Sequence, residues 1–203
     1  YQNQKKIFRM NSKSIATLRI LLYNLKKSTR RKKLILYPKA HFNNVKEISI
    51  EFLEKNNIKA LILDVDNTLI DYDRNMPDGT VEWVEQLKNN GIKFYIVSNT
   101  NKKDKVEQVS QKLKIKYNYF AKKPLKTGLL KAQKELQEKP ENVAVVGDQI
   151  FTDVLGGNRC KMFTILIEPI AEKDIWLTKV KRPIEIFIKK KYLKKINKGG
   201  DMD

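Results

Sequence analysis

Short apolar runs that end in acidic or small polar residues recur along the chain, and this pattern constrains the fold more than any other feature. Residues 60–63 are followed directly by Asp64, and residues 143–146 are followed by Gly147 and Asp148. Helical patterns separate these runs, and strands that alternate with helices form a parallel sheet covered by helices on both faces. We therefore expect one α/β domain whose strand ends meet at a single edge of the sheet.

The expected elements alternate throughout the central part of the chain. The expected strands are residues 59–63, 92–97, 117–120, 143–146 and 163–167, and the expected helices are residues 46–56, 79–90, 104–113, 126–137 and 150–157. Asp78 is the expected N-cap of the second helix. The intervals between strands are too short for an inserted cap domain, so we expect an uncovered active site. Such a site favours a substrate presented by something large, such as a membrane, a nucleic acid or a protein.

Acidic residues stand where the chain leaves two of the expected strands. Asp64 and Asp66 lie two residues apart after the first strand, and Asp148 and Asp153 follow a later strand. Burying a strand and ending it in acids costs desolvation free energy unless a cation or a proton compensates. The pattern therefore suggests a bound metal, and the alternative is an acidic turn that only caps the strand.

Two further strand ends offer groups that suit phosphate. Ser98 and Asn99 follow the second expected strand, and their hydroxyl and amide groups can hydrogen-bond phosphate oxygens. Lys122 and Lys123 compete for the role of a cation that neutralises phosphate charge. The adjacent Pro124, which cannot continue a strand, favours Lys123.

Taken in order, the motifs Asp-x-Asp-x-Thr, strand-Ser, Lys-Pro and Gly-Asp-x-x-x-x-Asp resemble those of the haloacid dehalogenase-like (HAD) superfamily of phosphohydrolases. The resemblance covers residues 36–172, and residues 36–40 and 147–159 look like the YqeG-type subfamily. It implies a HAD-like Rossmannoid three-layer sandwich of the capless subclass III. Relatives of this type include phosphatases that act on phosphatidylglycerophosphate, so the resemblance also implies this lipid as the substrate and phosphatidylglycerol as the product.

The reaction itself can be argued from the residues. A carboxylate and a phosphate dianion repel each other, but a divalent cation held by Asp64 and Asp148 would cancel the repulsion. We expect Asp64 to attack phosphorus and form an aspartyl-phosphate, while Asp66 protonates the leaving alkoxide and later takes a proton from water. Lys123 would neutralise the phosphoryl oxygens, and the all-oxygen ligand set predicts Mg²⁺. The resemblance adds that Asp66 lends its main-chain carbonyl to the metal, and that Asp153 binds the metal through water or orients Asp148.

The positive charge of the chain is concentrated at its two ends. The formal net charge is +19, yet residues 40–172 carry 20 basic and 19 acidic residues. Residues 1–39 hold 12 Lys or Arg and no acid. The predicted parts are a basic amphipathic extension (1–35), a phosphatase domain (36–172) and a basic C-terminal helix or tail (173–203). Basic ends on a nearly neutral core indicate attraction toward an anionic surface.

The N-terminal arm has an amphipathic pattern besides its charge. Its apolar stripe consists of Ile15, Leu18, Leu21, Leu22 and Leu25. A basic helix of this kind can lie in a membrane interface, although it is too short to span a bilayer. A helix docked on the core and a cleavable organellar presequence are the alternatives. A weaker pattern near the C-terminus repeats apolar residues every four positions from Ile184 to Ile196.

Three functional hypotheses follow. The leading one is a Mg²⁺-dependent phosphomonoesterase that acts on a phosphorylated lipid at an anionic membrane, as a cytoplasmic protein bound peripherally. The second is a polynucleotide or phosphoprotein phosphatase whose basic ends hold the polymer. The third is a non-catalytic nucleic-acid or ribosome-binding protein, which the intact set of site residues argues against. Nucleic acid is less favoured because basic patches rich in aromatic residues are not evident, and the oligomeric state is left open.

Overall fold

A computed structural model of the chain describes residues 33–171 and 184–194. Contacts within the chain group residues 1–34 and residues 35–203 into separate units, and the sheet belongs to the second unit. The amphipathic helix expected in the N-terminal arm lies outside the described residues, as do residues 172–183. The division of the chain into three parts therefore stays a prediction.

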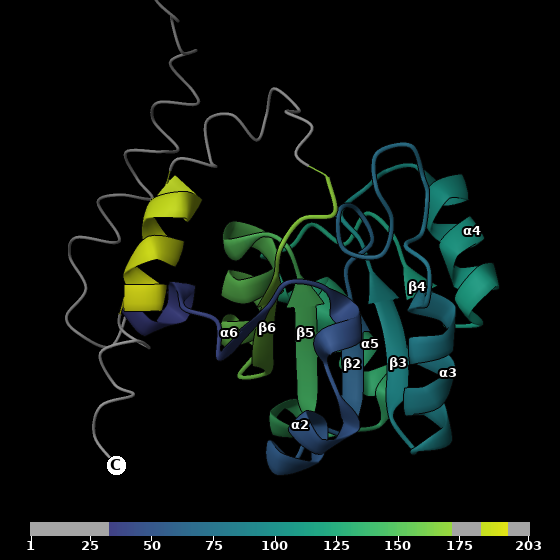
Figure 1. The fold of residues 1–203 in the computed structure, drawn as a ribbon, viewed down its shortest axis with the longest axis horizontal. Helices are drawn as coiled ribbons and strands as arrows, with labels where there is room; N and C mark the ends of the chain where they lie inside the picture. The colour runs from purple at the N-terminus through teal and green to yellow at the C-terminus, as the bar shows by residue number, and fades with distance from the viewer. Residues whose placement is uncertain (1–32, 172–183, 195–203) are drawn as a thin grey trace, which may run out of the picture. The chain divides into compact units, whose positions relative to one another are not determined.

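Six strands form one parallel sheet in the order β1-β6-β5-β2-β3-β4 (Figure 1). The strands are β1 (Ala40–Phe42), β2 (Ala60–Leu63), β3 (Lys93–Val97), β4 (Tyr117–Asn118), β5 (Val143–Gly147) and β6 (Phe163–Ile167). β2 lies in the interior of the sheet with β5 on one side and β3 on the other. The carboxyl ends of the strands share one edge, because all neighbouring strands run parallel.

Helices cover both faces of this sheet. Up to residue 171 the α-helices are α2 (Ile50–Lys55), α3 (Thr80–Asn89), α4 (Lys103–Leu113), α5 (Lys126–Leu136) and α6 (Leu155–Arg159). The other helical turns are η1 (Lys33–Leu36), η2 (Val45–Glu47), η3 (Pro140–Asn142) and η4 (Ile150–Val154). Side chains alternate between the two faces of a strand. Leu61 and Leu63 of β2 thus join the core under α2, α3 and α4, whereas Ile62 packs with α5 on the other face. The two cores confirm the expected three-layer α/β fold.

Two expectations about helices are wrong. The expected helix at residues 46–56 is broken, because the side chain of Ser49 caps a new helix, α2. Asp78 does not cap α3, since Gly79 is the N-cap and has a φ of 79°, a conformation open to glycine. The main-chain carbonyl of Asp78 instead accepts a hydrogen bond from Lys46 Nζ at 2.8 Å.

β1 was not expected from the sequence. Its three residues pair in parallel with β6 and are half-buried. His41 in β1 lies 2.8 Å from Glu168, measured from Nε2 to Oε1. The single histidine therefore ties β1 to the segment that follows β6.

A further helix spans residues 184–194, and several of its side chains contact the domain. Lys189 forms an ion pair with Glu168, and the ring of Tyr192 lies 5.9 Å from the ring of Tyr37. The exposed residues of the helix are Ile186, Phe187, Lys190, Lys191 and Lys194. Among the helices that the structure describes, none is long and apolar enough to cross a bilayer.

Candidate active site

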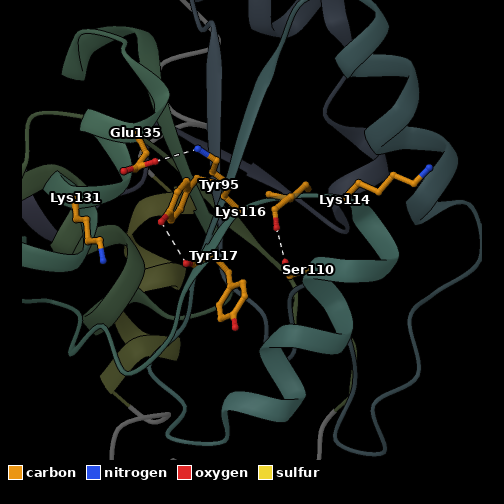
Figure 2. A pocket seen from close by; sticks show the side chains of 8 residues that line it. Tyr95, Ser110, Lys114, Lys116, Tyr117, Lys131 and Glu135 are labelled. Carbon is orange, nitrogen blue, oxygen red and sulfur yellow. Dashed lines mark hydrogen bonds and ion pairs between the residues drawn. The ribbon is translucent and has the colours of Figure 1, made fainter.

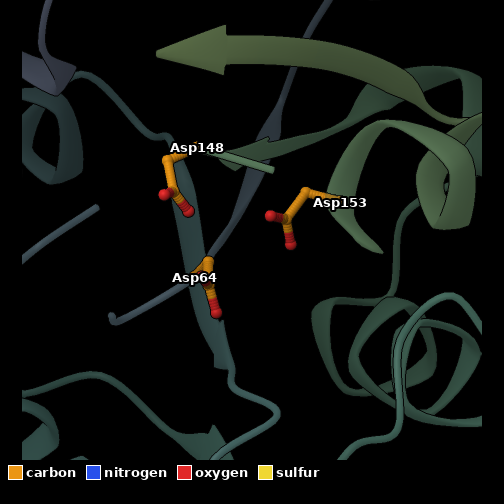
Figure 3. A group of neighbouring side chains, drawn as sticks. All are labelled: Asp64, Asp148 and Asp153. Carbon is orange, nitrogen blue, oxygen red and sulfur yellow. The ribbon is translucent and has the colours of Figure 1, made fainter. Parts of the chain in front are cut away.

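Three carboxylates converge at the carboxyl edge of the sheet. Asp64 follows β2, Asp148 follows β5, and Asp153 lies in η4, the turn that comes next. β2 and β5 are paired neighbours, and the Asp64 N–H donates to the Val146 carbonyl at 3.0 Å. One oxygen from each carboxylate lies within 4.8 Å of the others (Figure 3). The structure thus brings together three predicted metal ligands, whose role as ligands stays a prediction.

The glycine that ends β5 makes this convergence possible. A Cβ atom on Gly147 would lie 2.3 Å from Cγ of Asp153. That separation is far shorter than two carbon atoms in contact can tolerate. Any larger residue here would push the Asp153 carboxylate out of the cluster.

Lys123 lies inside the carboxylate cluster. Its ammonium bonds Asp64 Oδ1 at 2.7 Å and the Val97 carbonyl at 2.8 Å, and it lies 2.6 Å from Asp153 Oδ1. The neighbouring Lys122 points elsewhere, with its ammonium 4.8 Å from the centre of the Phe120 ring. Of the two lysines that competed in the sequence, Lys123 is therefore the one in the site.

The charges of the cluster are not balanced by protein groups. Burial raises the pKa of Asp64 to about 7 in spite of Lys123, and burial together with Asp64 raises the pKa of Asp148 well above its usual range. Burial opposes the charge of Lys123, but Asp153 and Asp64 outweigh it and raise the pKa of the ammonium. Oδ1 of Asp148 is buried and has no hydrogen-bond partner among the described residues. Excess negative charge and an unpaired carboxylate oxygen fit a hard divalent cation bound by oxygen ligands.

The side chain of Asn99 is hydrogen-bonded to the main chain of Lys123. Its side-chain oxygen accepts from the Lys123 N–H at 2.6 Å, and its Nδ2 donates to the Lys123 carbonyl at 2.9 Å. The amide therefore holds the loop of Lys123, and phosphate binding by Asn99 stays a prediction. Ser98 is buried beside it, and its Oγ accepts from the Thr100 N–H at 3.2 Å.

Sequence reasoning missed Lys105, which contacts Asp66. This buried lysine of α4 forms an ion pair with Asp66 Oδ1. It was hidden in the sequence by the exposed lysines around it. One signal was available, since Lys105 is four residues before Val109 and eight before Leu113, on the buried stripe of α4.

The comparison with protein families decides the identity of the chain. The sequence profile of the family described as "Mitochondrial PGP phosphatase" matches residues 21–171. The chain belongs to this family. The phosphatase is also 41% identical over 154 residues to "Probable phosphatase YqeG" of Bacillus subtilis, covering 75% of this chain and 89% of the relative. It is thus a HAD-type phosphatase of the YqeG kind, as the motifs predicted.

Solved structures also resemble the phosphatase. An uncharacterized protein from Listeria monocytogenes has a TM-score of 0.45 and 19% identity, over 66% of this chain and 99% of that one. A HAD phosphatase from Thermococcus onnurineus has a TM-score of 0.43 and 20% identity, over 50% and 51% of the two chains. The cobalt-bound deoxy-D-mannose-octulosonate 8-phosphate phosphatase from Haemophilus influenzae has a TM-score of 0.41 and 19% identity, over 46% and 60%.

The cleft of the phosphatase has a wall that the sequence did not reveal. No domain is inserted between β2 and β3 or between β3 and β4, where every residue is described. A cavity of 180 Å³ nevertheless runs from Asp148 to Glu185, Ile186 and Lys189 of the C-terminal helix. Glu185 Oε1 accepts a hydrogen bond from the Phe151 N–H at 3.0 Å, which fastens the helix to η4. The expectation of an uncovered site is therefore corrected on this side.

A larger cavity of the phosphatase lies away from the carboxylates. It measures 630 Å³ and is lined by residues of β3, β4, α4 and α5 (Figure 2). Tyr95 donates to the Tyr117 carbonyl at 3.2 Å there, and Lys116 pairs with Glu135 at 3.3 Å. Glu135 is the one carboxylate among the lining residues, all of which are described, so this cavity lacks the metal-binding chemistry of the site.

Proposed function

We propose that this phosphatase hydrolyses phosphatidylglycerophosphate to phosphatidylglycerol with Mg²⁺, through an aspartyl-phosphate on Asp64. The family match carries the choice of lipid, because the family is described by activity on PGP. The carboxylate cluster supports the chemistry, since Asp64 lies buried beside Lys123 where charge on a phosphoryl group would be compensated.

Each side chain of the site has a separate role in the proposed reaction. Asp64, Asp148 and Asp153 would hold Mg²⁺, which supplies positive charge against the phosphate when it is bound. Lys123 bonds Oδ1 of Asp64, so Oδ2 is the oxygen that attacks phosphorus. The bond from phosphorus to the alcohol oxygen then breaks, and Asp66 gives a proton to that oxygen. In the second step water attacks phosphorus and gives a proton to Asp66, the bond from phosphorus to the Asp64 oxygen breaks, and inorganic phosphate leaves with the Asp64 carboxylate restored.

The C-terminal helix supports action at a membrane. Its exposed residues Ile186 and Phe187 are 50% and 57% accessible, and Ile186 also lines the cavity that reaches Asp148. Lys190 and Lys191 lie on the same exposed side. Apolar side chains flanked by lysines suit the interface of an anionic bilayer. We therefore propose peripheral binding with the helix at the lipid surface, beside the entrance to the site.

The decisive measurement is kcat/KM with Mg²⁺ at equal salt for three substrates. These are phosphatidylglycerophosphate in vesicles, a 5′-phosphorylated oligonucleotide and a phosphopeptide. We expect the lipid to be preferred, because the basic ends raise the local concentration of enzyme at the surface. A clear preference for the oligonucleotide would replace the lipid by a polynucleotide as the substrate.

Membrane binding has its own test. We expect Phe187→Ser, and deletion of residues 1–33, each to weaken cosedimentation with anionic vesicles while hydrolysis of a small soluble ester changes little. Leu130→Ser is the matched control, because Leu130 is an exposed apolar residue of α5. Binding that is unchanged in both variants would remove the membrane surface from the proposal.

A further inference from the structure

A small cationic cavity lies between the loop that follows β2 and helix α4, and one of its lining residues, Lys105, contacts Asp66. It measures 70 Å³, and Arg74, Lys105 and Lys112 line it together with Gln108 and apolar side chains. No carboxylate is among its lining residues, all of which are described. The cavity is thus lined by three cations, and the carboxylates that pair with Arg74 and Lys105 lie outside its lining.

Lys105 is the buried cation of this cavity. An ammonium group has three N–H donors, and Asp66 Oδ1 is the acceptor that the described part of the chain gives it. A buried ammonium needs further acceptors, because a desolvated charge with unmet hydrogen bonds is costly. An anion that entered the cavity would supply them.

The walls of the cavity are held in place by Arg74. Its Nη1 donates to Asp104 Oδ2 at 2.8 Å and to Gln108 Oε1 at 3.2 Å, which fixes the loop after β2 against α4. These two bonds use only one of the three nitrogens of the guanidinium group. The other two nitrogens of Arg74 have N–H donors that an anion in the cavity could use.

The position of Asp66 relates this cavity to the substrate. The general acid must reach the oxygen of the leaving alcohol, so the alcohol lies against Asp66. A group a few bonds beyond that oxygen then lies next to Lys105, which contacts Asp66. The volume suits a small polar group, since one water occupies about 30 Å³ in the liquid, and it excludes an acyl chain.

We propose that this cavity is a subsite for a second phosphate, a phosphodiester carried by the leaving alcohol of the substrate. The proposal rests on the proposed function in one respect, the place of Asp66 as general acid. A phosphatidylglycerophosphate head group and the end of a polynucleotide both carry a phosphodiester near a terminal monoester. Soluble substrates can separate these two sources without a membrane.

The test uses two pairs of soluble substrates. The first pair is glycerophosphoglycerophosphate against glycerol 3-phosphate, and the second is a 5′-phosphorylated dinucleotide against its mononucleotide. The readout is the ratio of kcat/KM within each pair, so a general loss of activity cancels. We expect the wild-type enzyme to prefer the substrate with the phosphodiester by about tenfold or more, the size expected for charge-assisted hydrogen bonds.

Variants of three lysines on α4 assign the preference to the cavity. Lys105→Gln should lower the ratio about tenfold, and Lys105→Arg should restore most of it, because the charge returns. Lys112→Gln removes an exposed lining cation and should lower the ratio about twofold to threefold, in keeping with weak exposed charges. Lys103→Gln is the matched control, since Lys103 is an exposed lysine of α4 outside the cavity, and the ratio should not change.

Each outcome decides between the proposals. If Lys105→Gln lowers kcat/KM equally for both substrates of a pair, Lys105 only positions Asp66 and the proposed subsite is overturned. A wild-type ratio near one would overturn it as well. If Lys105→Gln does not fold, as judged by its thermal unfolding, the ratio in Lys112→Gln decides in its place. A preference found only for the dinucleotide would support the subsite but contradict the lipid as the substrate.

Discussion

Two aspartates that lie two residues apart at the end of β2 each pair with a lysine, and the two pairs differ in burial and in the number of partners. In the first pair the side chains of Asp64 and Lys123 are 7% and 2% exposed, and Lys123 also pairs with Asp153. In the second pair the side chains of Asp66 and Lys105 are 35% and 10% exposed. The first lysine is shared by two carboxylates, whereas the second pairs with one carboxylate that is partly exposed.

The difference separates a fixed part of the site from an adjustable one. A buried lysine held by two carboxylates and a main-chain carbonyl cannot leave without exposing uncompensated charge. A pair with one half-exposed partner can exchange that partner for a substrate group at little cost. The pair of Asp64 thus suits the reaction centre, and the pair of Asp66 suits contact with a leaving group that comes and goes.

The largest expected effect is on the fixed pair. Asp64→Asn should lower kcat by about 10³-fold or more, because it removes the nucleophile and one metal ligand at nearly constant volume. The thermal unfolding temperature should stay near the wild-type value or rise, since a buried charge is removed. A variant that kept more than about a tenth of the wild-type rate would show that Asp64 is not the nucleophile.

Lys123→Gln should destabilise the fold strongly. It leaves Asp64 and Asp153 buried without their cation, a situation that typically costs about 3–5 kcal/mol. Urea denaturation in the absence of metal measures the free energy of unfolding directly. A loss below about 1 kcal/mol would mean that the buried pair contributes no more than a surface pair, and the contrast between the two pairs would disappear.

Metal-free protein should lose stability as pH rises. The pKa of Asp64 is raised by burial to about 7 in the folded protein, so the folded state holds a proton that the unfolded chain gives up near pH 4. The contribution of such a group to the free energy of unfolding is fully present below its pKa in the unfolded chain. It is lost as pH rises through its pKa in the folded protein. We expect thermal unfolding temperatures in EDTA to fall between about pH 4 and pH 7, and Mg²⁺ to flatten the profile. An unfolding temperature in EDTA that does not change with pH would argue against uncompensated negative charge in the carboxylate cluster.

The smallest effect is expected for the adjustable pair. Lys105→Gln should change the free energy of unfolding by about 1 kcal/mol or less, because its partner Asp66 is partly in water. The same urea series that measures Lys123→Gln gives the comparison. Equal losses in the two variants would show that both lysines are structural to the same degree.

The sequence was sufficient to predict the features that depend only on the parallel direction of the strands. Parallel strands place their carboxyl ends at one edge, so Asp64 and Asp148 could be brought together without knowing any side-chain contact. β1 was not predicted because three half-buried residues at the edge of a sheet do not form an apolar run in the sequence. Lys105 was missed because it lies among exposed lysines, and its place on the buried stripe of α4 was the one signal that distinguished it.

Other features could not be read from the sequence because they depend on contacts across the fold. The task of Asn99 is set by where the chain returns at Lys123. The wall formed by the C-terminal helix depends on the bond between Phe151 and Glu185. Neither pattern carries a local signal, since an amide or a carboxylate can bond many partners of the same type.

The two neighbours of β2 in the sheet are made at different times. β3 follows β2 soon along the chain, whereas β5 is synthesised only after α3, α4 and α5. A growing chain therefore carries β2 with the main-chain N–H and C=O groups of one edge unpaired, and such an edge can pair wrongly with other chains. Docking of β5 closes that edge and joins Asp148 to Asp64 in a single event. We expect nascent chains to be most prone to aggregation, and without phosphatase chemistry, until residues 143–153 have left the ribosome.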